Sequence, residues 1–366
     1  MELPGFGNRD VESLAEIFRY YAKVETPRLD SRVYELLSAG VAEDPAILEL
    51  CREIPARQPA PNVLFAAVQD LLMEQADARP GREPGSSARS LARFYPALAG
   101  APIPDASPWP DFRAFCLENR ERLVPRLRTG RTQTCVVHRC AVILPALATL
   151  PRIREAGSRV ALLEIGPSAG LNLRLDRYRY DYGGGQVWGA PEARPVLACE
   201  RRGANAPPLP GTLDVVTRRG VDLDPIDLED PAAVRWLRAL VWPEHAWRLR
   251  QMDEALAHAA STPVEIEAGD ATREIGRHVA RLPRDAARVV FATHVLYQIP
   301  EEGRRRLREA LAEASRERPV DFVSMESTGR GDSELRWLGF EDGERRTNEV
   351  LARADSHGRW LEWGEA

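Results

Sequence analysis

The segment 161–173 constrains the fold of this chain more than any other part of it. It begins as an apolar run of strand length, is broken at Gly166 and Gly170, and continues over residues 171–173 with a pattern that predicts the start of a helix. A buried strand, a tight glycine turn and a helix N-terminus together form a place where backbone N–H groups converge on a ligand. The segment therefore predicts an α/β fold with a binding loop directly after a buried strand.

Two chemistries fit this loop. With Glu164 ahead of it and small residues at alternate positions, it is typical of an acidic, glycine-rich nucleotide loop. Taken as Gly166-x-Ser168-x-Gly170 alone, it is typical of the nucleophile elbow of a serine hydrolase.

The hydrolase alternative requires Ser168 as the nucleophile, followed along the chain by an acid and then a histidine. Asp270 and His294 stand in that order. However, an elbow needs no carboxylate ahead of it, and a hydrolase places several strands before its elbow, whereas a long helical region precedes Ser168. The nucleotide-type loop is therefore the favoured interpretation.

The length of 366 residues favours two domains. Apolar residues recur at helical spacing up to Gly157, apart from a loop predicted over residues 79–90, and this predicts a helical domain or lid over residues 1–157. From residue 158 to 366 strands alternate with helices, which predicts a mostly parallel α/β sheet with an aromatic hairpin inserted near residues 177–212. The strands are predicted at 159–165, 195–199, 213–217, 264–267, 288–293 and 320–325, with strand-like pieces at 335–340 and 359–363.

Composition excludes several classes of partner. A net charge of −5 gives no long-range attraction to nucleic acid or anionic lipid. The longest apolar run, Cys140–Leu150, is too short to span a membrane. The five cysteines are scattered, and no histidine pair has metal-ligand spacing, so we expect reduced thiols, a cytoplasmic location and no metal. A small-molecule substrate is the expected partner, and the oligomeric state is left open.

Polar residues follow each strand predicted for the sheet. Glu164 and the glycine turn follow the first, Arg219–Pro225 the next, Gly269-Asp270-Ala271 the third, Thr293-His294 the fourth and Glu326–Thr328 the fifth. Because ligands of open α/β sheets bind beyond the carboxyl ends of the strands, we expect these residues to gather at one edge.

The order of these motifs resembles that of the class I S-adenosylmethionine-dependent methyltransferases, which implies a Rossmann-like fold. Over nearly its full length the chain also resembles a bacterial family of uncharacterised proteins, domain of unknown function 2332. The phrases that carry the second resemblance are Arg131-Thr-Gln-Thr134, Glu164 to Asn172, Asp176-x-Tyr178-x-Tyr180-x-Tyr182-Gly183, Trp242-Pro243 and His357-Gly-Arg-Trp-Leu-Glu-Trp363. This family resemblance implies a fold and little about activity.

The methyltransferase resemblance implies S-adenosylmethionine as cofactor. Gly166, Ser168 and Gly170 would then form the turn against its amino-acid part, with Asn172 just beyond them. Glu164 would lie beneath that turn and hold loop N–H groups or the ammonium of the cofactor.

Two further acids and a threonine complete the implied cofactor site. Asp222 would accept hydrogen bonds from the ribose, although it stands much further than the usual ~20 residues from the glycines, so Glu200 is a competitor. Asp270 would bind the adenine amino group, and Thr293 lies at the end of the fourth strand. Asp222 could equally form a turn, and Asp270 could cap a helix that starts near Thr272.

His294 is the candidate general base, because histidine titrates near neutrality and this one follows an apolar strand. A hydrogen-bonded structural histidine is the alternative. Methyl transfer to a soft nucleophile can also proceed by positioning alone, without a base.

Two groups of residues are candidates for substrate binding. One is a polar cluster ahead of an apolar helix, and the other is a set of tyrosines in the hairpin that could instead pack one of its faces. They are Arg131, Gln133, Thr134 and Arg139, and Tyr178, Tyr180 and Tyr182. In the family that the chain resembles, Thr-Gln-Thr is typically followed by Asn-Glu, whereas Cys135-Val136 stands here, which implies altered or lost activity.

The sequence therefore predicts an S-adenosylmethionine-binding protein that acts as a methyltransferase on a small molecule. A non-catalytic methyltransferase-like fold that serves as an interaction module is one alternative. A serine hydrolase that uses Ser168 is the other.

Overall fold

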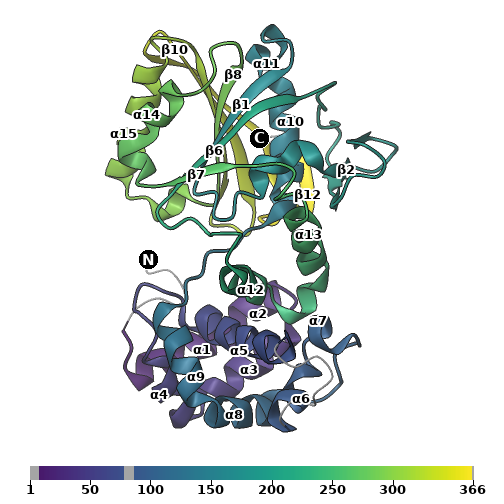
Figure 1. Ribbon diagram of the computed structural model, residues 1–366, viewed down its shortest axis with the longest axis vertical. Coiled ribbons are helices and arrows are strands. Elements are labelled where there is room, and N and C mark those ends of the chain that lie inside the picture. The colour runs from purple at the N-terminus through teal and green to yellow at the C-terminus, as the bar shows by residue number, and fades with distance from the viewer. Residues whose placement is uncertain (1–7, 78–85, 365–366) are drawn as a thin grey trace. The chain divides into compact units, whose positions relative to one another are not determined.

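The computed structural model describes residues 8–77 and 86–364, so most of the loop predicted over 79–90 lies outside the described residues. The chain divides into two compact units, one formed by residues 1–134 and 228–249 and the other by 135–227 and 250–366 (Figure 1). This division differs from the predicted boundary at residue 157. Residues 135–157 form helices that pack on the sheet of the second unit, and 228–249 return to the first.

The first unit is helical, and the part of it that the structure describes contains no strand. Its elements are α1 (Val11–Tyr20), the π-helical turn η1 (Tyr21–Glu25), α2 (Thr26–Arg28), α3 (Arg32–Ala42), α4 (Pro45–Cys51), α5 (Ala60–Asp77), α6 (Ser86–Ala92), α7 (Pro96–Ala99), α8 (Trp109–Glu118), α9 (Arg120–Thr129), α12 (Pro231–Ala239) and η4 (Pro243–His245). The helix α13 (Ala246–Leu256) begins in this unit and ends in the second.

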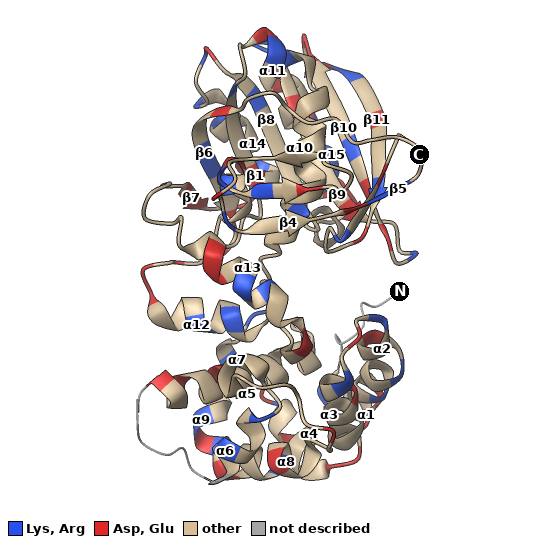
Figure 2. Ribbon diagram, turned by 90° about the vertical axis from the view of Figure 1, so that its right-hand side faces the viewer, with Lys and Arg blue, Asp and Glu red and all other residues tan. Residues whose placement is uncertain are grey.

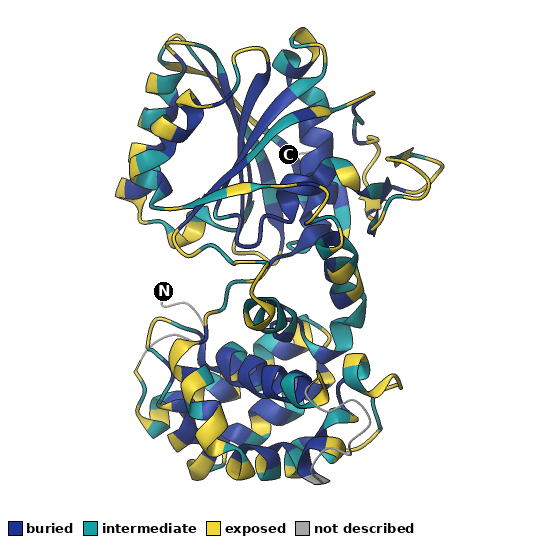
Figure 3. Cartoon of the chain, viewed as in Figure 1, coloured by how far each residue is buried: buried dark blue, intermediate teal, exposed yellow. Residues whose placement is uncertain are grey.

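The helix α5 forms the centre of the first unit, and Figure 3 shows it buried along most of its length. Asp70 on this helix is 4% exposed and accepts hydrogen bonds from Arg126 of α9 and Arg235 of α12, at 2.7 and 2.9 Å. A buried carboxylate is costly without charged partners, so Arg126 and Arg235 compensate the burial of Asp70, and Trp236 of α12 packs against the apolar core of the same unit.

The second unit is built on a nine-stranded sheet with the order β5-β12-β11-β10-β9-β8-β1-β6-β7. Neighbours from β9 to β7 are parallel, and β9, β10, β11 and β12 are successively antiparallel. The strands are β1 (Arg159–Ile165), β5 (Glu200–Arg202), β6 (Asp214–Asp222), β7 (Glu265–Ala268), β8 (Ala287–Thr293), β9 (Val320–Ser327), β10 (Ser333–Glu341), β11 (Glu344–Ala354) and β12 (Trp360–Trp363). The prediction of an α/β fold with a mostly parallel sheet is confirmed.

Helices cover both faces of this sheet (Figure 1). On one face lie α14 (Ala271–Ala280) and α15 (Glu301–Ala314), packed against Ala161, Leu163 and Ile165 of β1. On the other lie α10 (Cys140–Thr149), which follows the 3₁₀ turn η2 (Val137–Arg139), and α11 (Pro151–Glu155). Since side chains alternate along a strand, Glu164 points to the face of α10.

The aromatic hairpin is confirmed. Its strands β2 (Arg179–Asp181) and β3 (Val187–Trp188) are antiparallel, and β4 (Val196–Ala198) completes a small three-stranded sheet. The three hairpin tyrosines are at most 2% exposed, and each hydroxyl donates to a backbone carbonyl: Tyr178 to Leu171, Tyr180 to Leu175 and Tyr182 to Ala141. Their placement differs from the predicted pocket lining, because rings and hydroxyls are both used in packing.

Acidic and basic residues are interspersed over each unit (Figure 2). The exposed side of α15 is an example, where Glu301, Arg304, Arg305 and Glu309 form ion pairs within the helix. No helix in the described ranges is long and apolar enough to cross a membrane.

Candidate functional site

The candidate site lies at the carboxyl end of β1. This strand is the topological switch point of the sheet, because successive strands are added first on one side of it and then on the other. From β1 the parallel sheet extends through β6 to β7 on one side and through β8 to β9 on the other. Such a switch point leaves a crevice beyond the carboxyl ends of the two central strands, and ligands of α/β sheets bind there.

The turn after β1 has a left-handed backbone at three alternate positions. The φ angles are +66° at Gly166, +57° at Ser168 and +66° at Gly170. A Cβ atom at Gly166 would lie 2.7 Å from Val295, and one at Gly170 would lie 2.9 Å from Ile266. The two glycines are therefore required by backbone conformation and by packing within the protein, rather than by the approach of a ligand alone.

The predicted helix after this turn is wrong in type. The chain continues as the short 3₁₀ segment η3 (Asn172–Arg177), which contains a kink at Arg174. A short, kinked 3₁₀ segment therefore stands where the N-terminus of an α-helix was expected.

Asp222, at the end of β6, holds the turn in place. Its Oδ2 accepts a hydrogen bond from the backbone N–H of Ser168 at 2.8 Å, and its Oδ1 accepts one from the N–H of Asp224 at 2.9 Å. Glu200 does not compete for this position, because it lies on β5, the edge strand of the sheet opposite β7, where it pairs with Arg202.

Glu164 is the deepest charged group of the site, and its side chain is incompletely paired. The residue is 1% exposed, and its Oε1 accepts a hydrogen bond from Asn172 Nδ2 at 3.1 Å. Its Oε2 and the hydroxyl of Ser168 are both buried without a hydrogen-bond partner in the described chain. Burial, with Asp222 nearby, raises the pKa of Glu164 to about 8. Two buried polar atoms, one at the end of β1 and one in the glycine turn that follows it, thus lack hydrogen-bond partners in the described chain.

Arg139 is the one member of the predicted polar cluster that belongs to the second unit. It is 9% exposed, and its Nε donates to the carbonyl of Ser356 at 2.9 Å. Burial lowers the pKa of Arg139 to about 10. The other three members, Arg131, Gln133 and Thr134, belong to the first unit.

His294 follows β8 with a left-handed backbone, φ +56°. Its N–H donates to the carbonyl of Met325, and its Nε2 lies 3.0 Å from the hydroxyl of Ser333. Burial and the nearby charge of Arg139 lower the pKa of His294 to about 3, which makes the imidazole a weak base at neutral pH. The preceding residue, Thr293, is buried at the end of β8. The geometry therefore favours the structural alternative for His294.

The hydrolase triad is not assembled in the structure. The hydroxyl of Ser168 has no partner in the described chain, whereas the imidazole of His294 faces Ser333. The carboxylate of Asp270 is bound to the N–H and hydroxyl of Thr272, at 2.9 and 2.7 Å.

Asp270 is the N-cap of α14, which agrees with the alternative prediction that it caps a helix starting near Thr272. We expect Asp270→Ala to lower the free energy of unfolding by about 1 kcal/mol and Asp270→Ser to restore most of it, because serine also caps helices. Urea unfolding of both variants measures this. If Asp270→Ser were as unstable as Asp270→Ala, the carboxylate would have a role other than capping.

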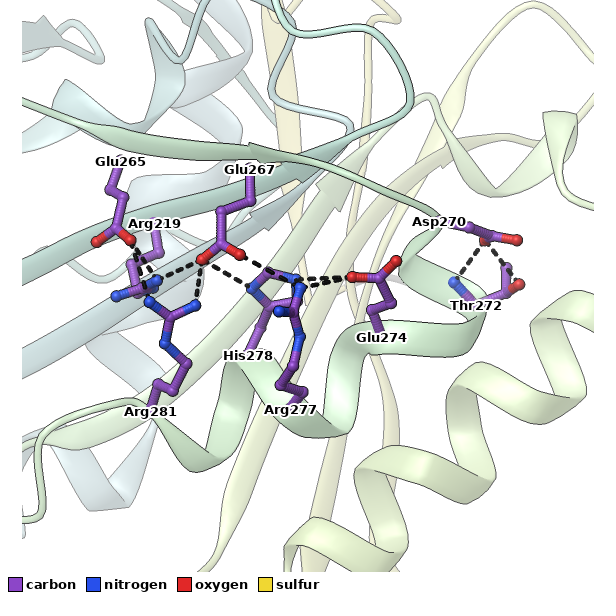
Figure 4. A network of polar contacts seen from close by, with 9 residues as sticks. All are labelled: Arg219, Glu265, Glu267, Asp270, Thr272, Glu274, Arg277, His278 and Arg281. Carbon is purple, nitrogen blue, oxygen red and sulfur yellow. Dashed lines mark hydrogen bonds and ion pairs between the residues drawn. The ribbon is translucent and has the colours of Figure 1, made fainter.

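The residues beside this cap form a polar network between the edge strand β7 and α14 (Figure 4). Arg219 of β6 donates to Glu265 and Glu267 of β7, at 2.5 and 2.7 Å. The ring of His278 is buried between Glu267 and Glu274, and burial lowers its pKa. Since these charges are paired with one another, the network fastens β7 to α14.

Glu326 is a site residue that the sequence interpretation noted at a strand end but did not include. Its Oε1 accepts hydrogen bonds from the backbone N–H groups of Val295 and Leu296, at 2.9 and 3.0 Å, and its Oε2 is buried without a partner in the described chain. Burial raises its pKa. Its position near the carboxyl end of β9 was the one feature of the sequence that could have identified it as a site residue.

Other chemistries find no support at this edge. The five cysteines are buried free thiols, and burial raises the pKa of Cys135 to about 12. No group of potential metal ligands occurs in the described ranges. A surface hollow in the first unit is lined by the charged residues around Arg9 and Arg52 and is not part of this site.

The fold and the site define an α/β protein with a glycine turn and a buried acid at the switch point of a mostly parallel sheet. The chain belongs to DUF2332, a family described as "Uncharacterized protein conserved in bacteria", whose family model matches residues 15–363. No curated protein and no solved structure matches the chain. The family resemblance is thus confirmed, whereas the cytoplasmic location and the resemblance to methyltransferases stay predictions.

Proposed function

We propose that the protein binds S-adenosylmethionine at the carboxyl ends of β1, β6 and β7 and is a Rossmann-like methyltransferase of a small molecule. The observation that carries this proposal is the buried Oε2 of Glu164, which lacks a partner beneath the glycine turn. A buried carboxyl oxygen of this kind requires a partner that the described chain does not provide, and the ammonium of an amino acid is a suitable one for the ionised carboxylate.

The strand order supports the same proposal. Numbered along the chain, the parallel strands β7-β6-β1-β8-β9 have the order 3-2-1-4-5, which is that of the doubly wound dinucleotide folds. Asp222 then lies at the end of the second strand, where an acid contacts a ribose in such folds, and the hairpin insertion accounts for its long spacing from the glycines.

The residues present fit the cofactor. Glu164 would hold the ammonium and Asp222, at the carboxyl end of β6, would accept hydrogen bonds from the ribose, since each carboxylate oxygen can accept more than one hydrogen bond. When bound, the cofactor would supply an activated methyl group. The chain would contribute mainly orientation and exclusion of water, because His294 is a weak base and the thiol of Cys135 stays protonated at neutral pH.

The proposal predicts that binding depends on pH. Glu164 is mostly protonated at pH 6 and must ionise to hold an ammonium, so affinity rises about 20-fold between pH 6 and pH 8 and a proton is released on binding. Above pH 8 the amino group of the ligand itself loses its charge, which ends the rise. Titration calorimetry of S-adenosylmethionine in two buffers of different ionisation enthalpy measures both effects.

Two results would contradict the proposal. One is the absence of binding at millimolar concentration, both for S-adenosylmethionine and for its demethylated product. The other is binding with the same affinity at pH 6 and pH 8, which would mean that Glu164 does not hold the ammonium.

A further inference from the structure

The guanidinium of Arg139 is incompletely paired within the protein. It is 9% exposed at the end of η2, and only its Nε makes a hydrogen bond, to the carbonyl of Ser356. It forms no ion pair with a carboxylate of the described residues. Its two terminal nitrogens make no hydrogen bond within the described chain, and neither is sealed from solvent.

The other buried arginines of this unit differ in this respect. Arg174 donates to the carbonyls of Thr262 and Gly170, and Arg288 donates to two carbonyls at the amino end of β8. Arg219 pairs with two carboxylates of β7. Arg139 therefore stands apart as a buried cation with accessible, unused donors.

Arg139 also lies among the groups of the candidate site. Its charge acts on the pKa of Glu164, His294, Tyr297 and Glu326, which belong to the carboxyl ends of β1, β8 and β9 and to η5 (Leu296–Gln298). A buried cation without a counter-ion is costly, and a planar anion from a ligand would remove that cost.

We propose that Arg139 is the receptor for a carboxylate of the ligand bound at this site. A guanidinium offers two parallel N–H groups that match the two oxygens of a carboxylate. The inference deepens the proposed function, on which it rests for the location of the ligand. The carboxylate has two possible sources: the amino-acid end of the cofactor, whose ammonium would lie at Glu164, or the methyl acceptor.

Matched ligand pairs distinguish the two sources. The first pair is S-adenosylmethionine and its decarboxylated analogue. The second set, tested in the presence of S-adenosylhomocysteine, comprises lactate with lactamide, glycine with glycinamide, and succinate with succinamide. Affinities are measured by calorimetry for the wild-type protein, Arg139→Lys, Arg139→Gln and the control Arg288→Gln, which removes a buried arginine at the opposite end of β8.

We expect at least one carboxylate to bind the wild-type protein about tenfold or more tightly than its uncharged or decarboxylated partner. The preference is lost in Arg139→Gln, reduced in Arg139→Lys, which keeps the charge without the planar fork, and unchanged in Arg288→Gln. Equal binding within every pair, or a preference that persists in Arg139→Gln, overturns the inference. If Arg139→Gln does not fold, the wild-type comparison and Arg139→Lys decide.

Failure of this inference and failure of the proposed function give different results. If S-adenosylmethionine does not bind but a small carboxylate binds in an Arg139-dependent way, the function is wrong and the inference holds. If S-adenosylmethionine and its decarboxylated analogue bind equally and no small carboxylate is preferred, the inference is wrong and the function holds.

Discussion

Replacing Glu164 by glutamine is expected to stabilise the ligand-free protein at pH 8 by about 4 kcal/mol and to abolish binding of S-adenosylmethionine. The pKa of Glu164 is raised to about 8 in the folded protein, above its ordinary value near 4.5. Such a group contributes its full stability below pH 4.5, and that contribution is lost as the pH rises towards 8. Glutamine has no proton to lose, so the variant retains at pH 8 what the wild-type protein has lost.

Urea unfolding at pH 5 and pH 8 measures the effect. The variant should exceed the wild-type protein in free energy of unfolding by about 4 kcal/mol at pH 8 and by less than about 1 kcal/mol at pH 5. If Glu164→Gln is instead less stable at pH 8, the carboxylate is held in its charged form by the protein itself, and its orphaned oxygen is no sign of a ligand.

Asp321→Asn is the matched control. Asp321 is a fully buried acid near the start of β9, at the other end of the sheet, and burial raises its pKa to about 6. Its Oδ1 accepts a hydrogen bond from Trp337, and its Oδ2 has no hydrogen-bond partner in the described chain. The control should also change the pH dependence of stability, but it should leave binding intact, because only Glu164 lies beneath the glycine turn.

The buried parallel strands were the part of the fold most accessible from the sequence. Every residue of β8 is buried, and after Arg288 the strand appears in the sequence as an apolar run, Val289–Ala292, that ends at Thr293. Polar residues at the end of such a run lie at the carboxyl edge of the sheet, which is why Glu164 and His294 were found from the pattern. Asp222 was assigned from the resemblance to methyltransferases, because the strand predicted before it ended at Thr217, whereas β6 continues to Asp222.

The strand β11 could not be predicted in the same way. Its first seven residues, Glu344–Val350, are exposed or half-buried, and they are mostly charged or polar. Neither the helical nor the alternating pattern therefore occurs there. The strand is specified by antiparallel pairing with β10 and β12, which is non-local information.

Helical periodicity also could not assign helices to units. The apolar helix α10 resembles those before it in the sequence, yet it packs on β9 and β10. Similarly, the pattern of Tyr178, Tyr180 and Tyr182 predicts that they share a face of the hairpin but not what that face contacts. Their hydroxyls donate hydrogen bonds to the backbone carbonyls of Leu171, Leu175 and Ala141. Only the folded structure shows these partners.

Between pH 7 and pH 4, the free energy of unfolding of His294→Asn is expected to fall by about 3 kcal/mol less than that of the wild-type protein. The pKa of His294 is lowered to about 3 by burial and by Arg139, whereas in the unfolded chain it is near 6.5. Between pH 6.5 and pH 3 the imidazole is therefore protonated in the unfolded chain but mostly neutral in the folded protein. The stability that the neutral imidazole provides is present above pH 6.5 and is lost as the pH falls towards 3.

Asparagine is the appropriate replacement because it tolerates the φ of +56° at this position and has no group that takes up a proton between pH 7 and pH 4. His294→Gly, which also tolerates this backbone, removes the imidazole without supplying a new hydrogen bond. Urea unfolding at pH 7 and pH 4 should show the same reduced loss of stability in both variants, whatever their stability at pH 7. A loss equal to that of the wild-type protein would mean that the folded protein accepts the proton, and His294 would then regain its candidacy as the general base.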